Sequence, residues 1–310
     1  MATTGYVDLQ VNGFRGVDFS SADLTVENFR RAAEGVLQTG TELFLPTLVT
    51  SPVERYRRNC DIIRTAVERE GWQRQIPGVH LEGPFLSPEP GAIGCHNPAW
   101  VIPPDPALLD MLGDIVRMIT VAAERPGMPE FIREAAGRGI LVSLGHQLAT
   151  TGDLQRAAAA GARTLTHLGN GIPNRLDRHR NPIWSGLACD ALTAMIITDG
   201  HHLPPEVIQA FLRCKGVDGI IVTSDAAPAT GLPPGRYRFL GGEVLLEPGG
   251  RLCSPSGNCL AGSASTLSMC MEYLRSLELL TPEELDAVGR RNALRLLDSA
   301  RKPDAPARRS

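Results

Sequence analysis

The chain has 310 residues, of which 43% are hydrophobic and 21% are charged, so it has the composition of a globular protein and enough length for a sizeable core. The formal net charge of −3 gives no reason to expect a nucleic acid as a partner. No apolar run reaches the roughly 20 residues that a membrane span needs, and the start MATTGYVDLQ lacks the features of a signal peptide. We therefore expect a cytoplasmic protein that binds neither membranes nor nucleic acids.

Seven cysteines are scattered along the chain without C-x-x-C spacing. An odd, dispersed set argues against a disulfide framework or a cysteine-rich zinc knuckle, and it agrees with a reducing cytoplasm. Most of the seven are expected to be small buried hydrophobic residues. Cys95 stands next to His96 in GCHNP, and its reactivity is left open.

A short apolar run followed by a helix-like stretch repeats from the start of the chain. Eight runs are predicted as strands: Tyr6–Asn12, Thr41–Val49, Ile76–Gly83, Val116–Glu124, Ile140–His146, Thr164–Leu168, Thr193–Asp199 and Gly219–Asp225. Five stretches between them are predicted as helices: Val26–Gln38, Val53–Glu70, Pro129–Arg138, Asp153–Ala160, with Asp153 as N-cap, and Pro205–Lys215.

The strand-like runs are almost continuously apolar, as in parallel strands that are buried on both faces. Eight alternations of strand and helix favour a closed (β/α)8 barrel over an open sheet. Polar residues fall at the carboxyl ends of these runs, which form the active-site face of such a barrel. They are Asn12, Glu82, Glu124, His146, His167, Asp199 and Asp225.

The pattern changes after Asp225. A turn-rich linker leads to a predicted β-hairpin insertion around 236–253, and helices are predicted over Ser263–Leu277 and Pro282–Leu297. We predict one catalytic barrel over residues 1–300 and a polar, disordered tail over 301–310.

Three residues of this rim are suited to hold a metal ion. His146 and His167 end neighbouring strands, which lie about 4.8 Å apart, and Glu82 ends the third strand. Two imidazoles and a carboxylate form a common open zinc site. Asp225, at the end of the last strand, is the candidate acid/base that takes a proton from water and passes it to a leaving amine.

Two further histidines lie on predicted rim loops. His96 and His202 are candidates to polarise a substrate carbonyl or to bind an anion, and spacing alone does not separate His202 from His201. Three arginines, Arg175, Arg178 and Arg180, form a local basic cluster that is either a solvated face or a phosphate site.

Several segments, in order, resemble the N-acetylglucosamine-6-phosphate deacetylases of the amidohydrolase superfamily. The resemblance runs from about Gly5 to Leu297 and rests on GYVDLQVNG, HLEGPFLSP followed by GAIGCHNP, VSLGHQLAT, TLTHLGNGIP, DGHHLPP, VTSDAAPATGLPPG and LAGSASTL. It implies hydrolysis of the acetamido group of a phosphorylated amino sugar, with release of acetate.

The resemblance also implies roles for single residues. Glu82, His146 and His167 match the metal ligands, Asp225 matches the acid/base and His202 the group that polarises the carbonyl. Residues that match substrate contacts are His96, Asn170, Gly171 and Arg178. In the family the arginine is often supplied by a neighbouring subunit, so a homodimer is expected, and Arg175 and Arg180 keep the choice of Arg178 open.

Two further expectations follow from the same comparison: one concerns a residue pair that a branch of the family shares, and the other a domain that the family usually carries. Gln10 and Asn12 replace the His-x-His pair that supports a second ion in many amidohydrolases. Neutral amides are poor zinc ligands beside imidazoles, so we expect one divalent ion, with zinc as the first candidate and Fe²⁺ or another divalent ion as alternatives. The family's small accessory β-sandwich is expected to be largely absent.

Three functions remain under consideration at this point. The first is deacetylation of N-acetylglucosamine 6-phosphate. The second is deacetylation of N-acetylgalactosamine 6-phosphate or another amido sugar. The third is a catalytically idle protein that binds sugar phosphates, which the retention of Asp225 argues against.

Overall fold

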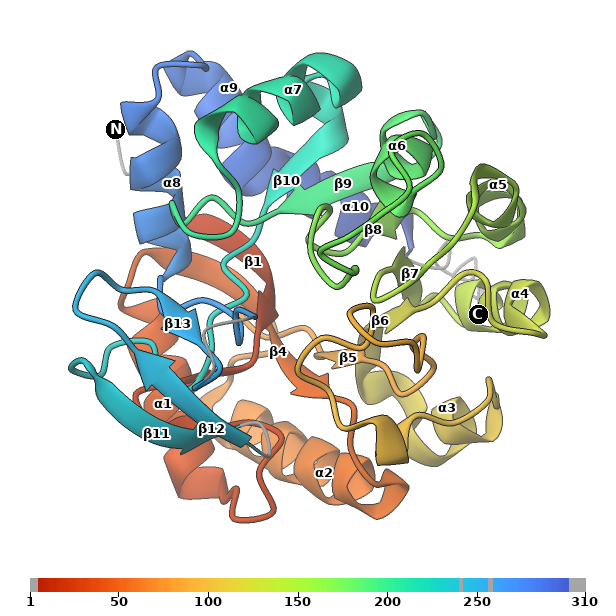
Figure 1. Cartoon of the computed structure of the whole chain (residues 1–310). Coiled ribbons are helices and arrows are strands. Elements are labelled where there is room, and N and C mark those ends of the chain that lie inside the picture. Colours follow the sequence, from red (N-terminus) through yellow and green to blue (C-terminus); the bar gives the residue numbers. More distant parts are fainter. Residues whose placement is uncertain (1–4, 240–241, 256–258, 301–310) are drawn as a thin grey trace, which may run out of the picture.

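The computed structural model describes residues 5–239, 242–255 and 259–300, and the predicted tail 301–310 lies outside the described residues. Eight parallel strands form one sheet that curves into a nearly closed barrel (Figure 1). In sheet order they are β1 (Tyr6–Val11), β4 (Thr41–Val49), β5 (Val79–Glu82), β6 (Val116–Val121), β7 (Leu141–Leu144), β8 (Thr164–Leu165), β9 (Thr193–Ile196) and β10 (Ile220–Val222). The predicted (β/α)8 barrel is confirmed.

Helices surround the ring of strands (Figure 1). They are α1 (Val26–Leu37), α2 (Val53–Glu70), α3 (Ala107–Leu112), α4 (Met128–Gly137), α5 (Thr151–Ala160), α6 (Pro182–Leu187), α7 (Pro205–Lys215), α8 (Leu267–Ser276), α9 (Pro282–Asp286) and α10 (Asn292–Ser299). Within the described residues, no helix has the length and apolar character needed to cross a membrane.

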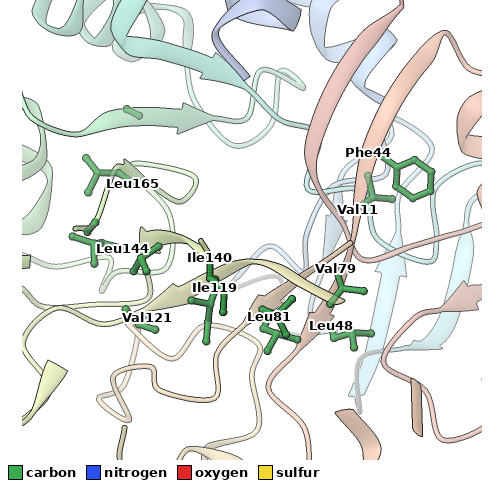
Figure 2. Packing of buried hydrophobic residues seen from close by; sticks show 14 of the residues in the cluster. Val11, Phe44, Leu48, Val79, Leu81, Ile119, Val121, Ile140, Leu144 and Leu165 are labelled. Carbon is green, nitrogen blue, oxygen red and sulfur yellow. The ribbon is translucent and has the colours of Figure 1, made fainter. Parts of the chain in front are cut away.

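The register of the strands decides which side chains face the helices and which face the barrel axis. Leu48, Leu81 and Ile119 are neighbours across β4, β5 and β6 and belong to the core cluster that also takes in residues of the surrounding helices (Figure 2). Successive residues of a strand point to opposite faces. Glu82 and Thr120, one position further along, therefore point to the opposite side from Leu81 and Ile119.

One end of the barrel is filled with apolar side chains. Strand residues such as Leu9, Met118 and Leu141 form a buried cluster together with Leu296 and Leu297 of α10. Because this end of the barrel is apolar, the buried polar groups lie at the opposite end, where the strands have their carboxyl ends.

Hydrogen bonds between β1 and the segment after β10 close the ring. The buried Asp8 carboxylate accepts hydrogen bonds from the Thr223 hydroxyl at 2.7 Å and from the Ser224 amide at 3.1 Å. A parallel bridge joins Val11 to Ala226, and the backbone N–H of Asn12 donates to the Ala226 carbonyl at 2.7 Å. The segment that carries Asp225 is thereby fixed next to the end of β1.

Two small sheets lie outside the ring of eight strands (Figure 1). One is antiparallel and contains β11 (Gly235–Phe239), β12 (Gly242–Leu246) and β13 (Leu252–Cys253), and the other pairs β2 (Gly13–Phe14) with β3 (Val17–Asp18). The first covers the segment after β10 through a buried cluster that includes Val244, Leu246, Ala227 and Ala229.

The helix boundaries depart from the predicted ones at three places. Helix α5 is capped by Thr150, and Asp153 is the third helical residue, whose carboxylate bonds back to the Thr150 amide, so the prediction that Asp153 is the N-cap is wrong. Helix α8 begins at Leu267 rather than Ser263, because Ser263 bonds to the segment around Asp225. The predicted last helix contains a π turn over Ala287–Arg291.

His80 makes a testable contribution to stability. The ring is fully buried, its Nδ1 donates to the Leu9 carbonyl at 2.9 Å, and its Nε2 lies 2.7 Å from the Thr120 hydroxyl oxygen. Burial above all lowers the pKa of His80 to about 4.

Because this pKa lies below the value of about 6.5 in the unfolded chain, the stabilisation is complete above pH 6.5 and is lost as the pH falls towards 4. We expect the difference in unfolding free energy between the wild type and His80→Gln to shrink by about 2 kcal/mol between pH 7 and pH 5. Urea unfolding of both proteins at the two pH values measures it, since ionisations common to both cancel. A difference that stays constant with pH would contradict this account.

Candidate metal and catalytic site

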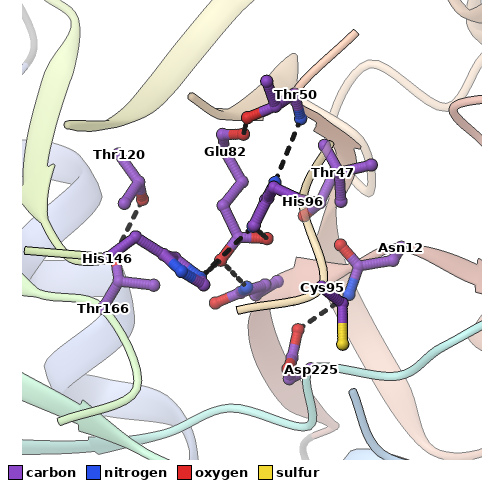
Figure 3. A network of polar contacts seen from close by, with 12 residues as sticks. Asn12, Thr47, Thr50, Glu82, Cys95, His96, Thr120, His146, Thr166 and Asp225 are labelled. Carbon is purple, nitrogen blue, oxygen red and sulfur yellow. Dashed lines mark hydrogen bonds and ion pairs between the residues drawn. The ribbon is translucent and has the colours of Figure 1, made fainter. Parts of the chain in front are cut away.

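Glu82 lies at the centre of the buried polar cluster at the carboxyl end of the barrel. Its Oε1 atom is 2.9 Å from His167 Nε2. The same Oε1 is 3.2 Å from His146 Nε2, and Oε2 is 3.8 Å from His96 Nε2 (Figure 3). Glu82 ends β5, while His146 and His167 follow β7 and β8. The structure therefore brings together the three residues that the sequence predicts as metal ligands.

His96 belongs to the same cluster, although it comes from an irregular loop. Its Nε2 lies 3.3 Å from His146 Nε2, and Glu82, His96 and His146 each offer a ligand atom within 4.8 Å of the others. Mutual distance thus singles out Glu82, His96 and His146 among the described residues. The two contacts of Glu82 Oε1 define a second, overlapping set in which His167 takes the place of His96. The resemblance placed His96 at the substrate instead.

The backbone is strained where the chain presents these side chains. His146, His167 and Asp225 have φ angles of 51°, 30° and 51°, in the left-handed region that non-glycine residues rarely adopt. Such strain costs about 1–3 kcal/mol per residue and is concentrated at functional sites. The positive φ angles turn the chain immediately after β7, β8 and β10.

The charges of the cluster depend on each other. Burial raises the pKa of Glu82, but hydrogen bonds from His146 and His167 outweigh it and hold that pKa well below its usual range. Burial lowers the pKa of His167, while the bond to Glu82 raises it more, so the net shift is upward. Burial, followed by the nearby His146, lowers the pKa of His96 to about 3. Glu82 is therefore a carboxylate and His96 a neutral imidazole.

Gln10 and Asn12 hold the two acids of the site. The side-chain amide of Gln10 donates to Glu82 Oε1 at 2.8 Å. The side-chain amide of Asn12 donates to Asp225 Oδ1 at 2.7 Å (Figure 3). The pair that stands in place of His-x-His thus orients carboxylates. Groups that orient ligands in this way usually matter for metal affinity.

The donor set fits a divalent metal ion. Two buried imidazoles point at one carboxylate through their Nε2 atoms, and the buried amide oxygens of Gln10 and Asn12 have no partner among the described residues. His146 is also oriented from outside the cluster, since its Nδ1 lies 2.8 Å from the Ala92 carbonyl. A carboxylate and imidazoles, one of them held by such an outer contact, are typical of zinc ligands.

Asp225 lines the same pocket as the histidines and keeps a proton more readily than an ordinary acid. It is buried, and burial together with the charge of Glu82 raises its pKa to about 6. A carboxyl group with a pKa near neutrality can both take and give a proton at physiological pH.

The structure separates the two adjacent histidines that spacing alone leaves undecided, in the way that the resemblance implies. The His202 side chain lines the pocket, and its Nδ1 donates to Asp199 Oδ2 at 2.8 Å, an oxygen that also accepts from the Ser263 hydroxyl. The exposed His201 bonds to the Gly249 carbonyl at 3.1 Å and does not line the pocket. Asp199, one of the predicted rim residues, therefore orients His202.

The cluster opens into a pocket of about 470 Å³. Asn170 and Gly171 line it, the buried Asn170 amide nitrogen has no partner among the described residues, and Gly171 packs against the His146 ring with φ = 62°. Arg178 is exposed and does not line the pocket. Among the described residues Arg251, on the turn between β12 and β13, is the arginine that does, and no pattern in the sequence marked it.

Comparison with known proteins places the chain in a family. No model of a protein family matches it. The N-acetylglucosamine-6-phosphate deacetylases of Haemophilus influenzae and Bos taurus are 32% and 35% identical to it, over 86% and 87% of this chain and 68% of each relative. The N-acetylgalactosamine-6-phosphate deacetylase of a Shewanella species is 32% identical over 87% of this chain and 67% of that protein.

Solved structures of the same kind superpose closely. The N-acetylglucosamine-6-phosphate deacetylase of Thermotoga maritima gives a TM-score of 0.86 at 26% identity, over 96% of this chain and 78% of that one. A mutant of the Mycobacterium smegmatis enzyme in complex with N-acetyl-D-glucosamine-6-phosphate gives a TM-score of 0.85 at 28% identity, over 95% and 77%. With relatives above 30% identity matched over two thirds of their length, this chain belongs to the N-acetylglucosamine-6-phosphate deacetylase family of the amidohydrolase superfamily.

Proposed function

We propose that the protein hydrolyses the acetamido group of an N-acetylated amino-sugar 6-phosphate, with N-acetylglucosamine 6-phosphate as the first candidate substrate. The observation that carries this proposal is the buried cluster of Glu82, His146 and His167 in a pocket that also contains Asp225 and His202. Release of acetate from N-acetylglucosamine 6-phosphate by purified, metal-loaded protein is the direct test. Metal-loaded protein that is inert on every N-acetylhexosamine phosphate would refute it.

In this proposal Glu82, His146 and His167 hold one divalent ion, with Zn²⁺ as the first choice and Fe²⁺ as the alternative. His167 is preferred to His96 because its Nε2 lies 2.9 Å from Glu82 Oε1, whereas His96 Nε2 lies 3.8 Å from Glu82 Oε2. A divalent ion held there supplies Lewis acidity to the amide carbonyl and to the attacking water.

The proton movements are assigned to Asp225. Its carboxylate accepts a proton from the attacking water and then donates it to the nitrogen that leaves, so that the sugar departs as an amine. Asn12 fixes the carboxylate for this task through its hydrogen bond to Oδ1. The raised pKa agrees with a group that is protonated and deprotonated in each turnover.

The remaining pocket residues are assigned to the substrate. His202, held by Asp199, is placed to polarise the carbonyl oxygen, where negative charge develops. His96, Asn170 and Gly171 are assigned to contacts with the sugar, and the free amide nitrogen of Asn170 supports this.

The phosphate is assigned to Arg178 of a neighbouring subunit in a homodimer. Arg178 is exposed outside its own pocket, and the Trp184 indole that donates to its carbonyl is 54% exposed, which is unusual for so large an apolar side chain. Both observations support a second copy at this place. Arg251 is the alternative, because it reaches the pocket from its own chain.

Deacetylation of N-acetylgalactosamine 6-phosphate is a second candidate. Relatives with that name match this chain at 31% and 32% identity, as closely as several of those that act on the glucosamine compound by name. A catalytically idle sugar-phosphate binder is disfavoured, because binding alone gives no use to Asp225. Acetate release from both epimers, with and without the 6-phosphate, separates the three.

The two overlapping ligand sets predict different metal contents. We expect His167→Asn to lose its metal and His96→Asn, its matched control, to keep about one ion per chain, because only His167 is assigned as a ligand. Elemental analysis after purification of both variants measures this. The opposite pattern would assign the ion to Glu82, His96 and His146.

Replacement of the proposed acid/base separates chemistry from metal binding. We expect Asp225→Asn to bind metal as the wild type does and to lose at least about 10²-fold in the rate of acetate release, the usual contribution of such a group. Turnover and metal content are measured on the same preparation. Loss of the ion together with activity would instead make Asp225 a ligand.

The phosphate assignment is tested by a pair of arginine variants. We expect Arg178→Ala to lower kcat/KM for the phosphorylated sugar about tenfold or more, since bonds to a charged group contribute about 1.5–3 kcal/mol, and to leave the activity on the plain sugar nearly unchanged. Arg251→Ala is the matched control. A loss confined to Arg251→Ala would move the phosphate to the arginine of the same chain.

A further inference from the structure

Two cysteines meet in the lining of the pocket. The Sγ atoms of Cys95 and Cys259 are 3.9 Å apart although the residues are separated by 164 positions, and both residues line the pocket. Cys95 lies in the irregular segment between β5 and α3, and Cys259 lies between β13 and α8. Both are exposed and neither is in a disulfide.

We propose that Cys95 and Cys259 are an oxidation site, at which a reversible disulfide ties the loop of His96 to the segment that precedes Ala261. A disulfide joins sulfur atoms about 2.05 Å apart, so the two must approach by roughly 2 Å. Neither residue lies in a helix or strand, so the approach needs only local movement of two loops.

The other cysteines do not compete for this role. Cys60, Cys189, Cys253 and Cys270 are buried, and the exposed Cys214 is in α7. No other pair of cysteine sulfurs in the described part of the chain is recorded in contact. Contact with Cys95 lowers the pKa of Cys259 to about 5, which favours the thiolate that reacts with oxidants.

The chemistry requires a two-electron oxidant, for which a hydroperoxide is sufficient. The Cys259 thiolate attacks one peroxide oxygen, and the O–O bond breaks. With hydrogen peroxide, Cys259 becomes a sulfenic acid, and the hydroxide that leaves is protonated to water. The Cys95 sulfur then attacks the sulfenic sulfur, the S–S bond forms, and hydroxide leaves and takes up the proton from Cys95 as a second water. A dithiol reverses the bond by exchange.

The disulfide would act on the pocket from both sides. The loop before Cys95 supplies the Ala92 carbonyl that orients His146 at 2.8 Å, and His96 follows Cys95 directly. On the other side Leu260, Ala261 and Gly262 line the pocket, and Cys95 already donates to the Leu260 carbonyl at 3.1 Å. We expect the oxidised protein to lose activity, because substrate must pass between two loops that are bonded together.

The test begins with reduced, metal-loaded protein treated with hydrogen peroxide. Remaining thiols are blocked with iodoacetamide, and the protein is digested without reductant for mass spectrometry. We expect a linked peptide containing Cys95 and Cys259 and the loss of two free thiols, both reversed by dithiothreitol. The linked peptide should be absent in Cys95→Ser and Cys259→Ser and present in Cys214→Ser, the control for an exposed thiol.

The linked peptide and the thiol count are measured without any turnover. A negative result in them therefore contradicts the disulfide and leaves the proposed deacetylation untouched. A second measurement, which rests on the proposed function, compares acetate release before and after peroxide. We expect reversible loss in the wild type and in Cys214→Ser, and no such loss in Cys259→Ser. Sulfinic acid on Cys95 without the linked peptide, or equal inactivation of Cys259→Ser, would overturn the proposal.

Discussion

The closure of the barrel between β1 and the segment after β10 is the constraint on which the site depends. Asp8, buried at this junction, accepts bonds from Thr223 and Ser224, and the Val11–Ala226 bridge continues the contact to the rim. Asn12 then binds the Asp225 carboxylate. Without this closure the first and last strands would part, and the proposed acid/base would no longer share a pocket with Glu82. A contact that stabilises the fold thus also sets the distance between two functional groups.

The site itself is organised around one buried carboxylate. Glu82 accepts from Gln10 and faces the imidazoles of His146 and His167, so its negative charge is balanced without solvent. A buried carboxylate without such partners would be protonated. Burial, followed by the charge of Glu82, raises the pKa of Asp225 while that of Glu82 is lowered, so that the two acids of the pocket differ in their affinity for a proton. Ligand and proton carrier are therefore distinguished by their surroundings and not by their residue type.

The proposed functional groups come from two kinds of position, the ends of strands and the loops that follow them. The proposed metal ligands and Asp225 are at strand ends, whereas the groups proposed for the substrate lie on loops after β5, β8 and β9, with the alternative Arg251 on the turn between β12 and β13. A barrel fixes its strand ends through the packing of the whole sheet, but its loops vary independently. In the proposed assignment, specificity for one epimer or for phosphate would depend on loops, which also carry Cys95 and Cys259.

The sequence by itself determined the repeat of strand and helix, the carboxyl-end rim and the identity of its polar residues, because hydrophobic periodicity and strand-end positions are local properties. It also indicated Glu82, His146, His167 and Asp225 as a group. Only the tertiary structure decided that Asp199 orients His202 in the pocket, that Gln10 and Asn12 orient carboxylates, and that Cys95 meets Cys259. These depend on loop paths and on contacts between residues far apart in the chain, which no local pattern encodes.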